Sequence, residues 1–163
     1  VKSIGDNAFS SRSKLTSITI PESVTTIGEE TFQYCSKLTN LAIPESVTTI
    51  GDGALRGCSS LTSITLPDNL TTIGIGIFEY CTNLKSITIP DGVTEIGDSA
   101  FYSCSSLTSI YCKATTPPIG GMDMFTAIGS SAKIYVPVGS GDAYKSAAYW
   151  SDYAVKIVEY DFS

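Results

Sequence analysis

The sequence predicts a repeat solenoid, in which the short strands and turns of one unit stack on those of the next. The first observation is a leucine that recurs every 23 residues over most of the chain. The second is an Ile-Gly dipeptide, and the third is a cysteine, both at the same interval. A fixed period of this length is typical of stacked units that each contact only their neighbours. The repeated positions are Leu15, Leu38, Leu61, Leu84 and Leu107, the dipeptides beginning at Ile4, Ile27, Ile50, Ile73, Ile96 and Ile119, and Cys35, Cys58, Cys81 and Cys104.

Each unit starts after its leucine with a short strand. Residues 17–20 alternate polar side chains with isoleucines, the period-two pattern of a strand that is buried on one face. Pro21 then ends the strand, because proline cannot donate a hydrogen bond to a sheet ladder. A second, shorter extended segment is expected over residues 24–27.

A turn completes the unit. Gly28 permits the chain to turn, and the acidic or small polar residue that follows suits the start of a short helix or 3₁₀ turn. One large apolar side chain per turn is expected to point into the core, and the cysteine closes the turn. The inward-pointing positions form a column of Phe9, Phe32, Leu55, Phe78 and Phe101.

The cysteines are predicted to be small buried thiols. A straight ladder with steps of about 4.8 Å cannot surround a tetrahedral zinc ion. Neighbouring cysteines would lie within disulfide range, but their Cβ vectors run parallel rather than converging. Cys112 is expected to belong to the core as well.

The repeats divide the chain into two parts. Residues 1–112 hold five 23-residue units, of which the first is incomplete, and residues 113–163 hold a degenerate sixth repeat followed by a C-terminal helix and strand that cap the array. In the sixth repeat Ile119 and Gly120 stay in register, so we place a one-residue insertion between Gly120 and Phe125. Val1 falls in the column of Val24, so we expect the chain to be part of a longer array.

The cap is predicted to consist of a helix over residues 141–150, with Asp142 at its N-cap, and a last strand over residues 155–158. A solenoid exposes its core at each end, and bulky side chains are needed to close it. The residues suited to this closure are Tyr144, Tyr149, Trp150 and Tyr153. No such cap precedes the first unit, so Ile4 and Phe9 are expected to be partly exposed.

These columns resemble the BspA-like, or Treponema-type, class of leucine-rich repeats. Residues 84–104 follow its pattern almost position by position, and the terminal segment is similar to that of Bacteroidetes surface proteins. The resemblance implies a right-handed leucine-rich-repeat coil and a secreted or cell-surface adhesion protein that binds other proteins or cells. The residues that carry it are Leu84, Ile87, Ile89, Pro90, Val93, Ile96, Gly97, Ala100, Phe101 and Cys104.

Composition excludes several classes of function. The chain has no histidine, which removes the usual general base at neutral pH and the commonest metal ligand. We therefore predict that it is not an enzyme and has no cofactor. A net charge of −6 argues against a nucleic-acid partner, which would require clustered Lys and Arg. No apolar run is long enough to span a membrane.

An acidic column follows the prolines. Stacked like charges repel one another, and a hard cation such as Ca²⁺ could relieve that repulsion. We favour a solvated turn with splayed side chains, because calcium needs about six oxygen ligands and the sequence offers no cage. The column consists of Glu22, Glu45, Asp68 and Asp91.

The polar side of the strands is the candidate binding face. In leucine-rich repeats this sheet lines the concave surface, which implies a protein or glycan partner on a host or neighbouring cell. The alternative is a structural spacer, in which the threonines only record their preference for strands. Tyr80, Tyr102, Tyr111 and Lys113 occur towards the C-terminal end and favour binding. The predicted face consists of Ser17, Thr19, Asn40, Ser63, Thr65, Ser86, Thr88, Ser109 and Tyr111.

Overall fold

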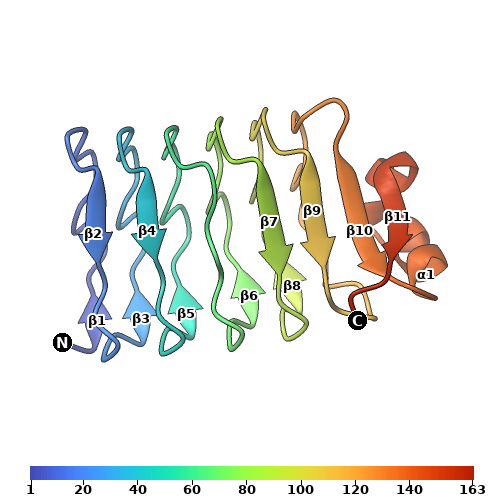
Figure 1. Ribbon diagram of the computed structural model, residues 1–163, viewed down its shortest axis with the longest axis horizontal. Coiled ribbons are helices and arrows are strands. Elements are labelled where there is room, and N and C mark those ends of the chain that lie inside the picture. The colour runs from blue at the N-terminus through green and yellow to red at the C-terminus, as the bar shows by residue number, and fades with distance from the viewer.

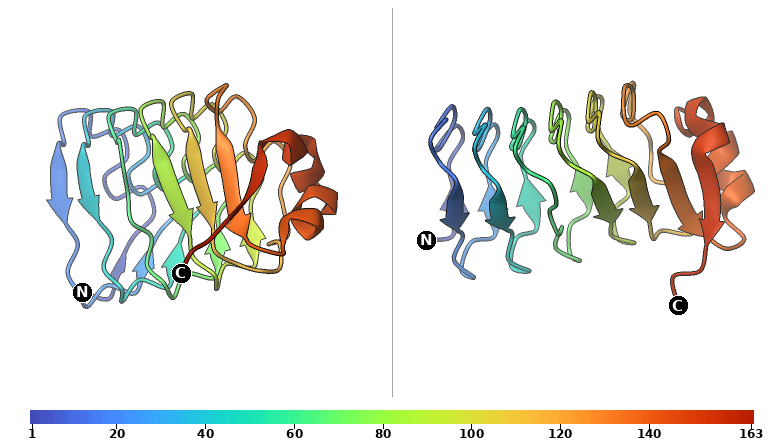
Figure 2. Two further views of the ribbon diagram at one scale, coloured as in Figure 1. Left: turned by 45° about the vertical axis from the view of Figure 1, so that its right-hand side comes forward. Right: turned by 45° about the horizontal axis from the view of Figure 1, so that its top comes forward.

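Successive 23-residue stretches of the chain form coils that stack along one axis (Figure 1). The computed structural model describes all residues, 1–163. We number the coils from residues 1, 24, 47, 70, 93 and 116, and the cap from residue 140. Figure 2 shows the helices of the cap at one end of the stack and the N-terminus at the other. The predicted parallel-strand solenoid is confirmed.

The longer strands lie side by side and form what we call the long-strand face (Figure 1). Four of them pair in parallel in the order β11-β10-β9-β7, and β2 pairs in parallel with β4. In coil 3 no strand forms over residues 63–66, although their side chains keep the alternation of exposed and buried positions. The face therefore continues through coil 3 without a ladder. Its strands are β2 (Ser17–Thr19), β4 (Asn40–Ala42), β7 (Ser86–Ile89), β9 (Ser109–Cys112), β10 (Lys133–Pro137) and β11 (Ile157–Tyr160).

Two-residue strands line the opposite side of the coils. They pair in parallel in the orders β1-β3-β5 and β6-β8, with the ladder interrupted between coils 3 and 4. Each threonine or glutamate in these strands faces outward, and each isoleucine from coil 2 onward is buried in the core. The strands are β1 (Ser3–Ile4), β3 (Thr26–Ile27), β5 (Thr49–Ile50), β6 (Thr72–Ile73) and β8 (Glu95–Ile96).

The segment expected to be a short helix or 3₁₀ turn forms a series of tight turns instead. Every second backbone N–H in it donates to the next coil, as from Glu30 to Asp52 at 2.9 Å and from Phe32 to Ala54 at 2.8 Å. In a helix these N–H groups would donate to carbonyls of the same helix. Because they donate to the next coil instead, a helix does not form here. The reversals place two residues per coil in the left-handed region: Asn7, Ser11, Glu30, Tyr34, Gly53, Gly57, Gly76, Tyr80, Ser99, Ser103, Asp123 and Ala127.

The core consists of columns that run through the whole stack. The leucines from Leu38 onward are fully buried, and the rings of Phe78, Phe101 and Phe125 stack with centroids 5.2 and 5.4 Å apart. Ile4 and Phe9, in the first coil, are only half-buried, as predicted. The interior of each coil is thus covered by its neighbours, and the first coil lacks one of them.

The glycine column is needed for space. A Cβ built on Gly97 would lie 2.6 Å from the backbone N of Ile75 in the preceding coil. The φ angle of Gly97 is not in the left-handed region, so the turn expected at this column does not itself require glycine. The coils approach each other so closely here that no side chain fits between them.

The predicted register of the sixth repeat is wrong. Ile119 pairs with Glu95 and is 73% exposed, whereas Ile96 is buried. Gly121, and not Gly120, contacts the backbone of Gly97 and so occupies the glycine column. The extra residue therefore lies before Ile119, within the loop that follows β9, where it does not disturb the stacking of coils.

The cap occupies the place of a further coil. Helix α1 (Gly141–Ser146) is followed by the 3₁₀ helix η1 (Trp150–Lys156) and by β11. The predicted single helix is thus two short ones, and the last strand begins at Ile157 rather than at residue 155. None of the helices is long and apolar enough to cross a membrane.

Two further predictions about the cap are wrong. The N-cap of α1 is Ser140, whose hydroxyl donates to the carbonyl of Pro137 at 2.6 Å, and Asp142 lies in the first turn. Tyr149 is 44% exposed with φ at +65°, so it does not close the core. The other predicted closing residues are buried: Tyr144, Trp150 and Tyr153.

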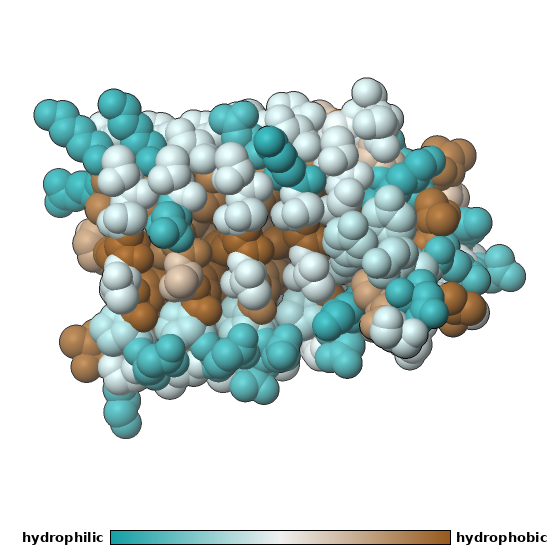
Figure 3. Space-filling model, in the orientation of Figure 1, coloured by the Kyte–Doolittle hydropathy of each residue, from teal (hydrophilic) through white to brown (hydrophobic).

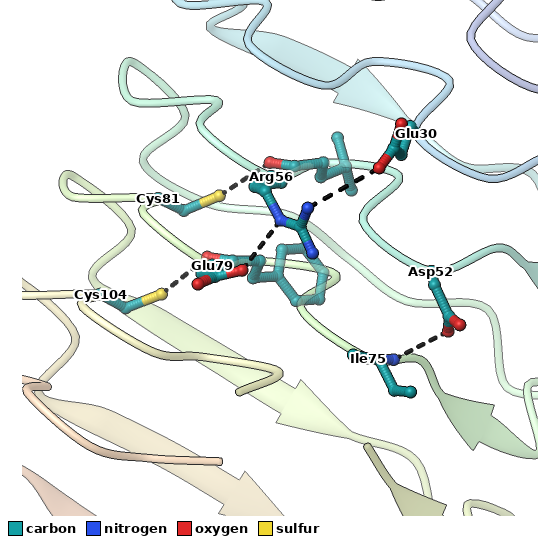
Figure 4. Close-up of polar contacts among 9 residues, drawn as sticks. Glu30, Asp52, Arg56, Ile75, Glu79, Cys81 and Cys104 are labelled. Carbon is teal, nitrogen blue, oxygen red and sulfur yellow. Dashed lines mark hydrogen bonds and ion pairs between the residues drawn. The ribbon is translucent and has the colours of Figure 1, made fainter. Parts of the chain in front are cut away.

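The cysteines are buried free thiols, which confirms that prediction. In the repeats each Sγ donates to a backbone carbonyl of the preceding coil, as from Cys58 to Phe32 at 3.2 Å and from Cys104 to Phe78 at 3.0 Å (Figure 4 shows Cys81 and Cys104). Removal from water disfavours the thiolate and raises the pKa of Cys58 and of Cys104 to about 12.

We expect the folded protein to resist a thiol reagent at pH 8. The thiolate is the reactive species, and burial both suppresses it and blocks access to it. The measurement is the release of nitrothiobenzoate from Ellman's reagent, before and after addition of guanidinium chloride. All cysteines should react only after denaturation, and fast reaction of most of them in the native state would contradict the stacked core.

Candidate functional site

Two rows of side chains run across the long-strand face. The predicted residues lie in these rows, all of them exposed except Ser109 and Tyr111, which are half-buried. Figure 3 shows small pale side chains in rows, with brown apolar surface visible between them. The first row is Ser17, Asn40, Ser63, Ser86, Ser109 and Lys133, and the second is Thr19, Ala42, Thr65, Thr88, Tyr111, Tyr135 and Val158.

The second row changes character at coil 5. Its members are small up to Thr88, and the next member is Tyr111, which pairs with Thr88 across β7 and β9. The ring of Tyr111 stacks on that of Tyr135 with centroids 4.9 Å apart and planes 15° apart. One face of Tyr111 is therefore covered by Tyr135, and the neighbour of Tyr111 on the other side of the row is the small Thr88. The second row therefore changes from small side chains, up to Thr88, to a wall of stacked aromatic rings that begins at Tyr111.

Two further aromatic residues from the end of the chain join this wall. Tyr160 meets the rings of Tyr111 and Tyr135 edge to face at 5.6 and 5.4 Å, and Phe162 meets Tyr160 at 4.9 Å. Figure 1 shows the chain after β11 crossing back towards the end of β9. We call Tyr111, Tyr135, Tyr160 and Phe162 the aromatic cluster.

A hollow of about 340 Å³ lies beside the aromatic cluster. Lys113 and Asp161 both line the hollow. They do not form an ion pair with each other, and the two ion pairs of the chain both involve Arg56. Hydrogen bonding from the side chain and the backbone of Ser163 lowers the pKa of the Asp161 carboxyl, and the backbone N–H donates to Oδ1 at 2.9 Å. The hollow thus offers one cationic donor, one anionic acceptor and ring surfaces.

The tyrosines that favoured binding in the sequence do not form one group. Tyr80 and Tyr102 contact each other edge to face at 5.9 Å, in the turn segments. Tyr111 and Lys113 lie at the end of the long-strand face instead. Sequence reasoning found Tyr111, but it missed Tyr135, Tyr160 and Phe162. Only Tyr135 could have been found, because it alternates with buried Ile134 and Val136 as Tyr111 does with its neighbours.

The tight turns that follow the glycine column form the turn side of the stack, and they carry a structural ion-pair network (Figure 4). The Nε atom of Arg56 lies 2.8 Å from Oε2 of Glu79, without the alignment of a hydrogen bond, and its Nη1 atom lies 3.7 Å from Oε1 of Glu30. Arg56 in this way links coils 2, 3 and 4. Its guanidinium lies over Gly76, where a Cβ would collide with it at 2.5 Å. Because these charges bind one another across three coils, we assign the network to stability rather than to binding.

In every second coil, the aspartate that follows the Ile-Gly dipeptide accepts a hydrogen bond from the backbone of the next coil. The carboxylate of Asp52 accepts a hydrogen bond from the backbone N–H of Ile75 at 2.8 Å, and Asp98 likewise accepts one from Met122 at 2.7 Å. Ile75 occupies the same position in coil 4 and is 49% exposed. The carboxylates of this column are therefore used within the stack.

The other acidic column, Glu22, Glu45, Asp68 and Asp91, lies exposed at the turns that follow the longer strands. Glu45 accepts a hydrogen bond from the backbone N–H of Asp68 at 2.9 Å. No three metal-ligating side chains lie close enough together to hold an ion.

Comparison with known proteins agrees with this architecture. The sequence model of the BspA type leucine-rich repeat region matches residues 2–128 in six copies. No curated protein matches the chain. A crystal structure of the Treponema pallidum leucine-rich repeat protein has the same fold, with a TM-score of 0.69 and 23% identity over 91% of this chain and 78% of that one.

Two solved structures are more similar in sequence. A leucine-rich repeat protein from Bacteroides ovatus is 34% identical with a TM-score of 0.65. A leucine-rich cell surface protein from Faecalibacterium prausnitzii is 30% identical with a TM-score of 0.61. Both alignments cover 83% of this chain but 43% of the other, so the chain spans less than half of these proteins. With its repeats matched over residues 2–128, the chain belongs to the BspA-type leucine-rich repeat family.

Proposed function

We propose that the chain is a non-catalytic recognition module that binds a protein or glycan through its long-strand face. The observation that carries the proposal is the step in the second row, from Thr88 to the aromatic cluster. A spacer needs only to repeat one set of exposed residues in each coil. Here the exposed residues change at one place, and aromatic rings gather there beside the unpaired Lys113 and Asp161.

The remainder of the face supports contact with a large partner. Its small hydroxyl side chains leave a shallow surface, on which apolar surface is visible between the rows (Figure 3). Exposed apolar area with a polar rim is typical of interaction sites. The face carries no histidine and no paired carboxylates, so we propose binding without a chemical step.

We propose an extracellular or cell-surface location for the protein. This location is supported by family membership and by the cell surface protein from Faecalibacterium prausnitzii, to which the chain is similar over 83% of its length.

Biolayer interferometry against a panel of extracellular-matrix proteins, mucins and glycans tests the proposal. A variant with Thr65→Arg and Thr88→Arg places two long charged side chains on the floor of the long-strand face, where both threonines are exposed. We expect wild-type protein to bind at least one panel member and the variant to bind it about tenfold more weakly or not at all.

The matched control carries Thr49→Arg and Thr72→Arg, at exposed positions of the short strands on the opposite side. This control should bind as wild-type protein does. Equal loss in both variants would show that charge alone, and not the long-strand face, is responsible. Absence of binding to every panel member would contradict the recognition module and favour the spacer.

A further inference from the structure

We propose that the hollow beside Tyr111 binds a neutral pyranose unit of a glycan, with the sugar ring against the face of the tyrosine that Tyr135 does not cover. This inference rests on the proposed function and specifies one ligand class and one site for it. The two classes of partner left open above, protein and glycan, differ in what they require of the surface, and the hollow meets the requirements of a sugar.

The first step is the accessible ring face. Tyr111 is flanked in its row by Tyr135 on one side and Thr88 on the other. Tyr135 stacks on one face of its ring at 4.9 Å, and Tyr160 and Phe162 approach the ring edge to face at 5.6 and 6.4 Å. Tyr111 and Thr88, its small neighbour in the row, both line the hollow. Aromatic faces carry negative partial charge, which attracts the partly positive C–H groups that line one side of a pyranose.

The second step is the pair of charged groups. Lys113 donates hydrogen bonds only, and the Asp161 carboxylate accepts them only. They are not paired with each other. Oδ1 of Asp161 accepts a hydrogen bond from the N–H of Ser163, which leaves Oδ2 of Asp161 and the ammonium of Lys113 for a ligand. Each hydroxyl of a sugar is both donor and acceptor, and one neutral sugar can satisfy both groups. An acidic sugar would be repelled by Asp161 and by the net charge of −6.

The third step is size and setting. The hollow, about 340 Å³, lies near the lower limit of small-molecule sites, roughly 300–1,000 Å³. Thr88 and Lys113 also line a second hollow together with Thr65, where a neighbouring sugar of the same glycan could lie. Strand β9 is already paired on both sides, so an extended peptide cannot add to it as a further strand.

A printed array of neutral, sialylated and sulfated oligosaccharides tests the inference. Wild-type protein should bind neutral members. Tyr111→Thr, which gives this coil the residue that Thr88 supplies in the preceding one, should weaken that binding about tenfold, since an aromatic contact and its burial are lost. Tyr111→Phe keeps the ring and should bind as wild-type protein does.

Two further variants complete the design. Tyr102→Thr removes a tyrosine from the turn side and should leave glycan binding unchanged. Lys113→Gln removes the cationic donor at an exposed position and should also weaken binding, so the inference can be tested even if Tyr111→Thr fails to fold by circular dichroism.

Three results would overturn the inference. They are binding only to acidic members, binding unchanged by both Tyr111→Thr and Lys113→Gln, and no binding to the array. If matrix proteins still bind and lose affinity in the Thr65→Arg, Thr88→Arg variant, the recognition module stands and only the sugar site fails. If neither glycans nor proteins bind, both fail.

Discussion

Replacing Trp150 with alanine is expected to lower the free energy of unfolding by about 3–5 kcal/mol, the range for removal of a buried tryptophan. The indole is fully buried, with ring centroids 4.8 Å from Tyr144 and 5.6 Å from Phe125. Its N–H donates to the carbonyl of Pro118 at 2.8 Å. The substitution would leave a cavity between the cap and coil 6 and a buried carbonyl without its donor.

The measurement is urea denaturation followed by far-ultraviolet circular dichroism, because Trp150 is the only tryptophan and its fluorescence is lost in the variant. Tyr149→Ala is the matched control, since it removes a neighbouring aromatic side chain that is 44% exposed. The control should change stability by about 0.5 kcal/mol or less. A similar small loss for Trp150→Ala would show that the cap does not stabilise the stack.

Repetition determines which parts of the fold the sequence could predict. Leucine recurs at the same buried position in each coil, as at Leu38, Leu61, Leu84 and Leu107. Recurrence separates such core positions from apolar residues that occur only once. The cap occurs once. Its apolar residues did not fix where α1 ends or where β11 begins, and Ser140 was as good an N-cap candidate as Asp142.

The error at Ile119 has a specific cause. The dipeptide of Ile119 and Gly120 copies the repeat, and sequence alone could not show that its isoleucine points into solvent. Met124, whose side chain packs beside Gly120, and the glycine at 121 restore the stacking one residue later. The register of coil 6 is identified by the exposure of Ile119 and its pairing with Glu95, and not by the residue types of the dipeptide.

The candidate site was predictable only in part. Alternation along β9 placed Tyr111 on the exposed side of the strand, and the same rule applies to Tyr135. Tyr160 and Phe162 reach the hollow because β11 pairs beside β10 and the chain then turns back across the sheet (Figure 1). That path depends on the cap, so the hollow and its charged pair could not be inferred from the repeats.

Gly97→Ala is expected to lower the free energy of unfolding by about 3 kcal/mol, at the upper end of the cost of adding a methyl group to a packed core. The new Cβ would lie 2.6 Å from the N of Ile75 and 2.8 Å from the C of Gly74. Both atoms belong to the backbone of coil 4, so relief requires coils 4 and 5 to separate. Separation would in turn weaken the hydrogen bond from the N–H of Gly97 to the carbonyl of Ile73, now 2.7 Å long.

Gly5→Ala provides a control at the same position of the first coil, where nothing lies within 4 Å of the added Cβ. Neither glycine has a left-handed φ, so the entropy that alanine removes from the unfolded chain, about 0.4–1 kcal/mol, favours both variants alike. The difference between their urea midpoints therefore measures the contact between coils alone. We expect Gly5→Ala to be neutral or slightly stabilising. Equal destabilisation of the two variants would mean that this column needs glycine for its backbone conformation, and that the close stacking of coils does not select it.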